Sequence, residues 1–269
     1  AINARSAALT FFPHPREVIQ GRSDPFYLSR FSERVEQIAE QGIDLIITHP
    51  FNQQVRNMRA ADFVAQMVAH LDLKQLWGGS FSLGYRREGD FAYLTQAGQA
   101  AGFSVHRFAP VHENETHISS STIRQLLRNA RVAEAAQLLT RPYAVSGEVI
   151  YGRQLGRTIG FPTANIAVWK KQLLPENGVY ASYIHIDGKR YAAATNVGVR
   201  PTIEPNQPIT IEAHILDFSA DIYHKHVRLD FIDHVRPEQK FGGLDALKTQ
   251  IKQDVAQVRQ ILALQPPLC

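Results

Sequence analysis

The hydrophobic pattern of the chain changes at Arg141-Pro142, and this change constrains the fold more than any other feature. Before it, short apolar runs alternate with amphipathic stretches, a pattern typical of βαβ units on a parallel sheet. After it, runs with a period of two follow one another and favour an antiparallel barrel, because closure removes exposed sheet edges. We therefore expect an α/β N-terminal domain over residues 1–140 and a β-barrel domain with a final helix over residues 141–265.

The apolar spacing predicts individual elements in both halves. In the first half we expect strands over residues 7–12, 44–48 and 103–108, another strand ending at Leu76-Trp77, and helices over residues 29–41, 60–71, 91–101, 122–128 and 132–139. In the second half we expect strands over residues 143–150, 179–186, 190–197, 209–216 and 227–235, and a helix from Leu244 to Leu262. Asp187-Gly188 predicts a type I′ hairpin turn, and residues 24–27 are expected to form a loop.

Composition excludes several classes of protein. No apolar run of the 269 residues approaches the ~20 residues of a membrane span, so we expect no membrane partner. The net charge of +4 is compatible with phosphorylated small molecules and too small to imply nucleic acid. The single cysteine, Cys269, allows no intramolecular disulfide and fits a reducing, cytoplasmic location. A monomer or weak oligomer is expected.

The most informative motif is the stretch Gly152-Arg-Gln-Leu-Gly-Arg-Thr-Ile-Gly-Phe-Pro-Thr-Ala-Asn165. Its three glycines, at positions 152, 156 and 160, can bring backbone N–H groups close to a polyphosphate. If Ala164 points away, Thr163 and Asn165 present two neutral oxygens on one side of an extended segment, which suits Mg²⁺. The alternative is a glycine-rich hairpin with a Pro-Thr turn.

This motif resembles the phosphate loop and Pro-Thr-Ala-Asn signature of the riboflavin kinase family. Further stretches resemble the same family in the same order: Asn177 to Tyr180, Asn196 to Thr202, Ile211 to His214, and Arg236 to Phe241. The first half is similar to the FMN adenylyltransferase domain of the prokaryotic bifunctional enzymes. The resemblance covers nearly the whole chain and implies ATP-dependent phosphorylation of riboflavin to FMN, followed by adenylylation of FMN to FAD.

The resemblance implies roles for residues of the second half. Thr163 and Asn165 correspond to the magnesium positions, and Glu212 corresponds to the base that takes the proton of the riboflavin 5′-hydroxyl. The residues implied in ATP binding are Gly152, Gly156, Arg157, Gly160, Phe161, Pro162 and Thr163, and those implied in flavin binding are Asn196, Arg200, Arg236 and Glu238. On its spacing alone Glu212 is better explained as a solvated strand residue, and only the resemblance favours the base; Arg200-Pro201 could instead form a turn at the barrel rim.

The resemblance also implies nucleotide-binding residues for the adenylyltransferase. These are His14, within a Pro-His-Pro element, and Gly84, Arg87, Ser119, Ser120, Ser121 and Arg124. Hydroxyl and N–H groups at a helix start, with an arginine one turn further, can form an anion site. The serines could instead simply cap the helix.

The sequence departs from the family in its first half. The family's opening Gly-x-Phe-Asp-Gly-x-His-x-Gly-His element, which holds the ATP phosphates, is absent, and Ser80 and Ser121 replace the usual Asp or Asn and Thr. We expect a longer native protein that carries this element before Ala1, and we expect these 269 residues to make little FAD. The alternatives are a kinase with a non-catalytic N-terminal half and a non-catalytic flavin- or nucleotide-binding regulator.

Overall fold

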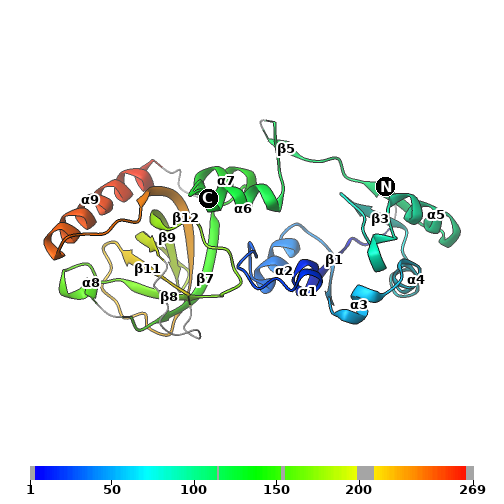
Figure 1. Cartoon of the computed structure of the whole chain (residues 1–269), viewed down its shortest axis with the longest axis horizontal. Coiled ribbons are helices and arrows are strands. Elements are labelled where there is room, and N and C mark those ends of the chain that lie inside the picture. Colours follow the sequence, from blue (N-terminus) through cyan, green and yellow to red (C-terminus); the bar gives the residue numbers. More distant parts are fainter. Residues whose placement is uncertain (1–3, 114, 153–154, 199–208, 265–269) are drawn as a thin grey trace. The chain divides into compact units, whose positions relative to one another are not determined.

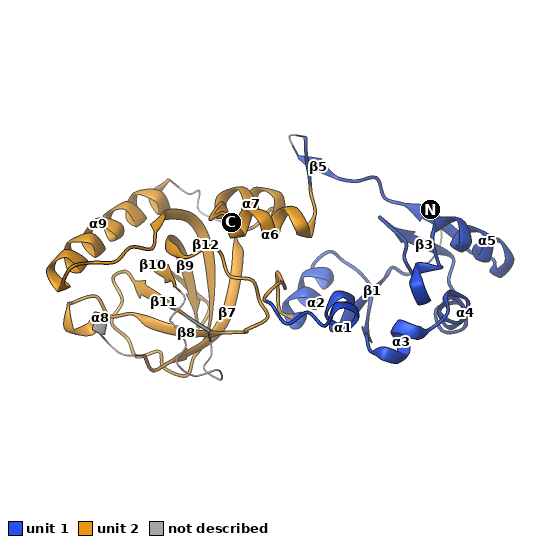
Figure 2. Ribbon diagram, viewed as in Figure 1, with its two compact units in different colours: residues 1–24, 31–117 blue, residues 25–30, 118–269 orange. Residues whose placement is uncertain are grey.

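The computed structural model describes residues 4–113, 115–152, 155–198 and 209–264. The chain divides into two compact units, of which the first contains residues 1–24 and 31–117 and the second contains residues 25–30 and 118–269 (Figure 2). The expected domain boundary at residue 140 stays a prediction, because a compact unit is not the same thing as a functional domain. No helix of the described residues is long and apolar enough to cross a membrane.

The first unit is built from two pairs of parallel strands. Strand β1 (Ala7–Phe12) pairs with β2 (Leu45–Pro50), and β3 (Gln75–Gly78) pairs with β4 (Ser104–Arg107). The helices of this unit are α1 (Pro15–Gln20), α2 (Phe31–Ala39), α3 (Gln53–Asn57), α4 (Ala60–Leu71) and α5 (Phe91–Ala101), with a 3₁₀ turn at Tyr85–Arg87 and a small hairpin of β5 (His112–Glu113) and β6 (Thr116–His117). The α/β class expected for this half is confirmed (Figure 1).

Local chemistry explains where the longer helices begin and end. In α4 the apolar side chains of Phe63, Val64 and Met67 share one face and are buried. The carboxylate of Asp90 accepts the N–H of Tyr93 at 2.8 Å and caps the start of α5. Gly102 then adopts a φ of +82°, a conformation that ends the helix without strain.

The two parallel pairs are separate sheets within the described residues, because no ladder of hydrogen bonds joins them. Parallel strands are usually covered on both faces. In this unit, however, Leu45 of β2 and Trp77 of β3 are 48% and 49% exposed. The apolar core around α4 and α5 therefore covers the sheets only in part.

The second unit is a closed six-stranded barrel with the strand order β10-β11-β8-β7-β12-β9, and every neighbouring pair is antiparallel. The strands are β7 (Tyr143–Ile150), β8 (Ala164–Val168), β9 (Gly178–Ile186), β10 (Lys189–Val197), β11 (Ile209–Ile215) and β12 (His226–Pro237). The expected antiparallel barrel is confirmed. At the β9–β10 hairpin, Asp187 and Gly188 have φ values of +49° and +76°, as the type I′ turn requires.

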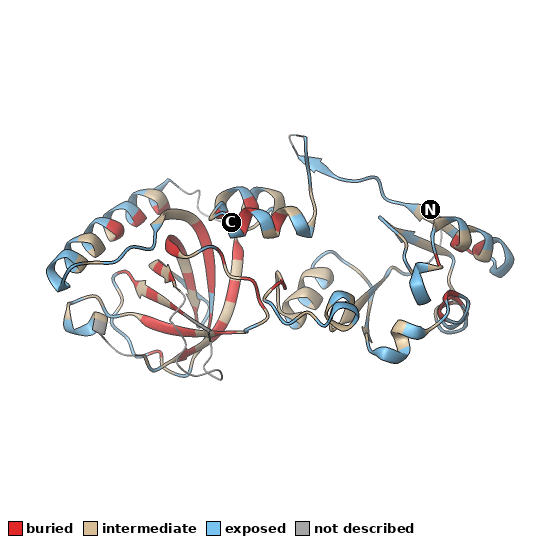
Figure 3. Ribbon diagram, in the orientation of Figure 1, coloured by how far each residue is buried: buried red, intermediate tan, exposed pale blue. Residues whose placement is uncertain are grey.

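Alternate residues of the barrel strands point inward and fill the core, as the burial pattern of β7 shows (Figure 3). Tyr180, Ile166 and Ile211 are fully buried there. Helices α6 (Ser120–Arg128) and α7 (Val132–Leu139) add buried residues to this core, and the last helix, α9 (Leu244–Ala263), packs on the outside of the barrel through Val258 and Leu262. The short helix α8 (Leu155–Thr158) lies in the β7–β8 connection.

Candidate functional site

Three polar residues lie in a row across three neighbouring strands of the barrel. Glu212 of β11 is directly opposite Asn165 of β8 on one side and Asn196 of β10 on the other. Directly opposed residues of antiparallel strands share a face of the sheet, with Cβ atoms ~4.5–5.5 Å apart. Glu212 and Asn165 therefore lie on one wall of the barrel.

This row lies on the outer face of the barrel. Ile166 and Ile211, which flank Asn165 and Glu212 in sequence, are fully buried inside. Because side chains alternate along a strand, Asn165 and Glu212 must point outward. Even so, Asn165 is only 4% exposed, so another segment must cover it.

The cover over Asn165 is Gly152. A Cβ atom on Gly152 would lie 2.2 Å from Nδ2 of Asn165 and 2.6 Å from its Oδ1, closer than real Cβ contacts allow. Only glycine permits this approach of the backbone. Gly152, the first residue of the motif, thus lets the loop pack directly against Asn165, its last residue.

The rest of the glycine loop closes on itself beside Thr163. The N–H of Phe161 donates to the carbonyl of Gly156 at 2.7 Å, and Gly160 turns the chain with a φ of +86°. A Cβ atom on Gly156 would lie 2.2 Å from the Phe161 carbonyl oxygen and 3.5 Å from Oγ1 of Thr163. Ala164, between Thr163 and Asn165, points into the barrel core, which is the geometry expected for two oxygens on one side.

His214 holds the loop on the barrel, a role that the sequence analysis did not assign. Its Nδ1 donates to the carbonyl of Pro162 at 2.8 Å, and its ring lies 5.4 Å from that of Phe161, edge to face. The signal was present in the sequence, because His214 is two residues beyond Glu212 on the same face of β11.

Glu238, one of the residues expected to bind flavin, extends the polar row beyond Asn196. A Cβ atom on Gly198 would lie 2.7 Å from Oε1 of Glu238 and 3.2 Å from Nδ2 of Asn196, so these two side chains converge at the end of β10. Arg236 makes a different contact: its Nε and Nη2 donate to the buried carboxylate of Asp254, both at 2.8 Å, and tie β12 to α9. A flavin contact of Arg236 stays a prediction, and Arg200 lies outside the described residues.

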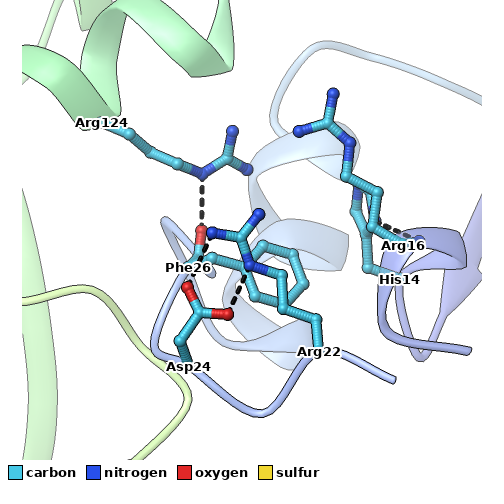
Figure 4. A network of polar contacts seen from close by, with 6 residues as sticks. All are labelled: His14, Arg16, Arg22, Asp24, Phe26 and Arg124. Carbon is cyan, nitrogen blue, oxygen red and sulfur yellow. Dashed lines mark hydrogen bonds and ion pairs between the residues drawn. The ribbon is translucent and has the colours of Figure 1, made fainter. Parts of the chain in front are cut away.

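The residues expected to bind nucleotide in the first unit are placed by local contacts. Nδ1 of His14 accepts the N–H of Arg16 at 3.1 Å and caps α1 (Figure 4). Gly84 has a φ of +74° and passes so close to α4 that a Cβ atom would lie 2.4 Å from the N–H nitrogen of Ala60. Arg87 follows in the adjoining 3₁₀ turn and is exposed.

The other four residues expected to bind nucleotide belong to the second unit: Ser119, Ser120, Ser121 and Arg124. His14, Gly84 and Arg87 belong to the first unit. Oγ of Ser119 accepts the N–H of Thr122 at 3.2 Å and caps α6, as one of the two interpretations expected; Ser120 and Ser121 form its first turn. Nε of Arg124 donates to the carbonyl of Phe26 at 2.7 Å (Figure 4). Their nucleotide contacts stay predictions.

The donor set of the barrel site fits magnesium better than a transition metal. Among the described residues no three His, Cys, Asp or Glu side chains are grouped as a metal cluster. The site instead offers the neutral oxygens of Thr163 and Asn165, next to a loop that can hold phosphate. Mg²⁺ usually takes few protein oxygens and completes its shell with waters and phosphate oxygens.

Comparison with known proteins gives the class of each half. The riboflavin kinase family profile matches residues 139–262, and the FAD synthetase family profile matches residues 1–122. The fold is thus that of a flavin kinase barrel that follows a flavin nucleotidyltransferase domain.

Relatives match both halves together. The bifunctional riboflavin kinase/FMN adenylyltransferase of Escherichia coli K12 is 36% identical, covering 96% of this chain and 83% of the relative. The protein of the same description from Haemophilus influenzae is 37% identical, covering 94% and 83%. The chain belongs to the bifunctional riboflavin kinase/FMN adenylyltransferase family. A crystal structure from Streptococcus pneumoniae, described as a macrolide-efflux protein, has a TM-score of 0.82 at 27% identity, covers 95% of this chain and 83% of that chain, and supports the fold.

Proposed function

We propose that this chain acts in FAD biosynthesis and that its barrel transfers the terminal phosphoryl group of ATP to the 5′-hydroxyl of riboflavin. The observation that carries the proposal is Glu212 lying directly opposite Asn165, beneath a glycine loop that covers the asparagine. Phosphoryl transfer depends mainly on positioning and charge neutralisation. A loop for phosphate, oxygens for a metal and one carboxylate for the attacking alcohol supply what that reaction needs.

Each part of the site has a proposed role. The N–H groups around Gly152, Gly156 and Gly160 bind the ATP phosphates, with Arg157 and Phe161 in the same loop. Thr163 and Asn165 would hold Mg²⁺, which neutralises phosphate charge when bound. Glu212 accepts the hydroxyl proton of riboflavin as a general base.

The flavin is proposed to lie along the polar row beyond Glu212. Asn196 and Glu238, which converge next to Gly198, supply hydrogen-bonding groups at that end. The substrates are small molecules, and we propose a cytoplasmic protein that is a monomer or weak oligomer. The first half supports the second step, adenylylation of FMN, through its family membership.

One chromatographic experiment tests the proposal. The chain is incubated with riboflavin, ATP and Mg²⁺, and the flavins are separated and identified by mass. We expect FMN to accumulate with time and with enzyme concentration. Absence of FMN from a folded preparation would contradict the kinase assignment.

Asn165→Ala is expected to raise the Mg²⁺ concentration required for half-maximal FMN formation by at least about tenfold, because the metal loses one of its two protein oxygens. The measurement is a magnesium titration at saturating ATP and riboflavin. Asn129→Ala is the matched control, since Asn129 is an exposed residue at the end of α6. An unchanged titration in Asn165→Ala would remove the residue from the magnesium site.

Gly152→Ala is expected to lower kcat/KM for ATP by about 10- to 100-fold, because the new methyl group would displace either the loop or Asn165. The melting temperature should change little, since the loop lies outside the barrel core. Gly79→Ala is the control, because a Cβ atom there meets nothing within 4 Å. Wild-type kinetics in Gly152→Ala would show that the close approach is not needed for ATP binding.

A further inference from the structure

The chain passes between its two compact units three times, at residues 24–25, 30–31 and 117–118. Residues 25–30, which we call the strap, are therefore part of the barrel unit although the chain before and after them belongs to the first unit (Figure 2). Phe26 and Tyr27 of the strap are only 2% and 3% exposed. A connecting loop that buries two adjacent aromatic side chains is an anchored segment.

The strap backbone pairs with the barrel unit like a short strand. The N–H groups of Phe26 and Tyr27 both donate to the carbonyl of Lys171 at 3.0 Å. The N–H of Leu173 donates to the carbonyl of Tyr27 at 2.8 Å, and Tyr27 forms a parallel bridge with Gln172. These bonds satisfy the strap backbone groups that burial removes from water.

Side chains of the barrel unit hold the strap from several elements. Gln172 is fully buried, and its Nε2 donates to the carbonyl of Ala144 in β7 at 3.0 Å and to that of Leu28 in the strap at 3.4 Å. The ring of Tyr27 lies 4.8 Å from that of Trp169, just after β8. The strap is thus attached to both β7 and the turn that follows β8.

Two arginines complete the attachment. Arg30, in the strap, donates from Nη2 to the carbonyl of Ser146 in β7 at 2.8 Å. Arg124, in α6, donates to the carbonyl of Phe26 and lies with its guanidinium carbon 5.7 Å from the centre of the Phe26 ring (Figure 4). Buried aromatic side chains and arginines are the groups that dominate the affinity of protein interfaces.

We propose that the strap is an interaction surface that keeps the fragment before residue 113 bound to the fragment after residue 117 when the chain between them is cut. A cut between residues 113 and 117 leaves the strap on the N-terminal fragment and its binding surface on the C-terminal fragment. The fragments stay associated, because the aromatic and hydrogen-bonded contacts of the strap do not depend on the covalent link at the cut.

The test is cleavage of the folded full-length chain. A protease recognition sequence is inserted between Glu113 and Thr116, which are both exposed, and the protein is cut under native conditions. Size-exclusion chromatography with mass measurement then reports association. One species with the mass of the uncut chain is expected, and two separated fragments would overturn the proposal.

Tyr27→Ala in the cleavable chain is expected to weaken the association by at least about 100-fold, because it removes the buried ring. The matched control is Tyr85→Ala, at a tyrosine that is 38% exposed in the first unit, and it should leave association unchanged. Fragments of Tyr27→Ala that still elute together at the same dilution would show that other contacts hold the halves.

A second measurement leaves the strap and its binding surface unchanged in sequence and so does not depend on a substitution in either of them. An excess of a synthetic peptide of residues 22–32 is added to the cut protein. Competition for the surface around Gln172 should release the N-terminal fragment in proportion to peptide concentration. No release at saturating peptide would contradict the strap as the attachment, and a scrambled peptide is the control.

Discussion

Replacing Glu212 with glutamine is expected to reduce kcat for FMN formation by about 10²- to 10⁴-fold, because the amide cannot accept the hydroxyl proton of riboflavin. The side chain keeps its size and its place opposite Asn165, so riboflavin should still bind with an affinity close to that of the wild type. Rapid-quench measurement of FMN and a separate titration of riboflavin binding distinguish the two effects.

Glu148→Gln provides the matched control for this variant. Glu148 is a half-buried residue of β7 on the same outer face of the barrel, two residues from Ile150, which lies opposite Asn165, and its carboxylate pairs with His224 at 3.0 Å, so it is a neighbouring carboxylate without the proposed role. Its replacement should leave FMN formation unchanged. Normal turnover in Glu212→Gln would show that another group, or water, receives the proton.

The second large effect concerns FAD. Incubation of these 269 residues with FMN, ATP and Mg²⁺ is expected to give FAD at least ~10³-fold more slowly than the relative from Escherichia coli, because the element that the family resemblance places on the ATP phosphates is not among these residues. The structure gives a second reason for slow FAD formation. The described strands of the first unit form two separate parallel pairs and not one continuous sheet. Appearance of FAD is followed by chromatography.

The same preparation must convert riboflavin to FMN, which shows that the chain is folded and active in its other half. With that control, slow or absent FAD formation assigns the defect to the first unit. Rapid FAD formation would instead show that the residues described here, His14, Gly84 and Arg87 among them, adenylylate FMN without the phosphate-binding element of the family.

Strongly periodic segments could be predicted from the sequence to the residue. The helices over residues 60–71, 91–101 and 132–139 and the strand over residues 143–150 have the predicted bounds. Their apolar residues repeat at one period and turn or capping residues lie at their ends, so local and tertiary preferences agree.

Shorter elements were missed for a physical reason. Helices α1 and α3 have six and five residues and no fully buried side chain, so they leave no periodic apolar pattern. Strand β8 has only five residues, of which the first two end the glycine motif, and the sequence indicated only an extended segment there. Residues 24–27 were interpreted as a loop, because nothing in their spacing shows that Phe26 and Tyr27 bind to a segment about 145 residues further on.

The composition of the site could be predicted, but its arrangement could not. Thr163, Asn165 and Glu212 follow from the motif and the family resemblance. That Glu212 lies opposite Asn165 depends on the register between β8 and β11, which is fixed by closure of the whole barrel. His214 shares a face of β11 with Glu212, which the sequence shows, but its hydrogen bond to the Pro162 carbonyl depends on how the loop folds back onto the barrel, which the sequence does not show.

The outward position of the polar row separates two demands on the same strands. In β8 and β11, Ile166 and Ile211 fill the interior, while their immediate neighbours Asn165 and Glu212 face outward, where we propose that the substrates bind. Substitutions that alter the volume of the interior and substitutions that alter the chemistry therefore fall on alternating positions. Directed evolution could raise thermal tolerance at one set of positions and change substrate preference at the other, with little trade-off between them.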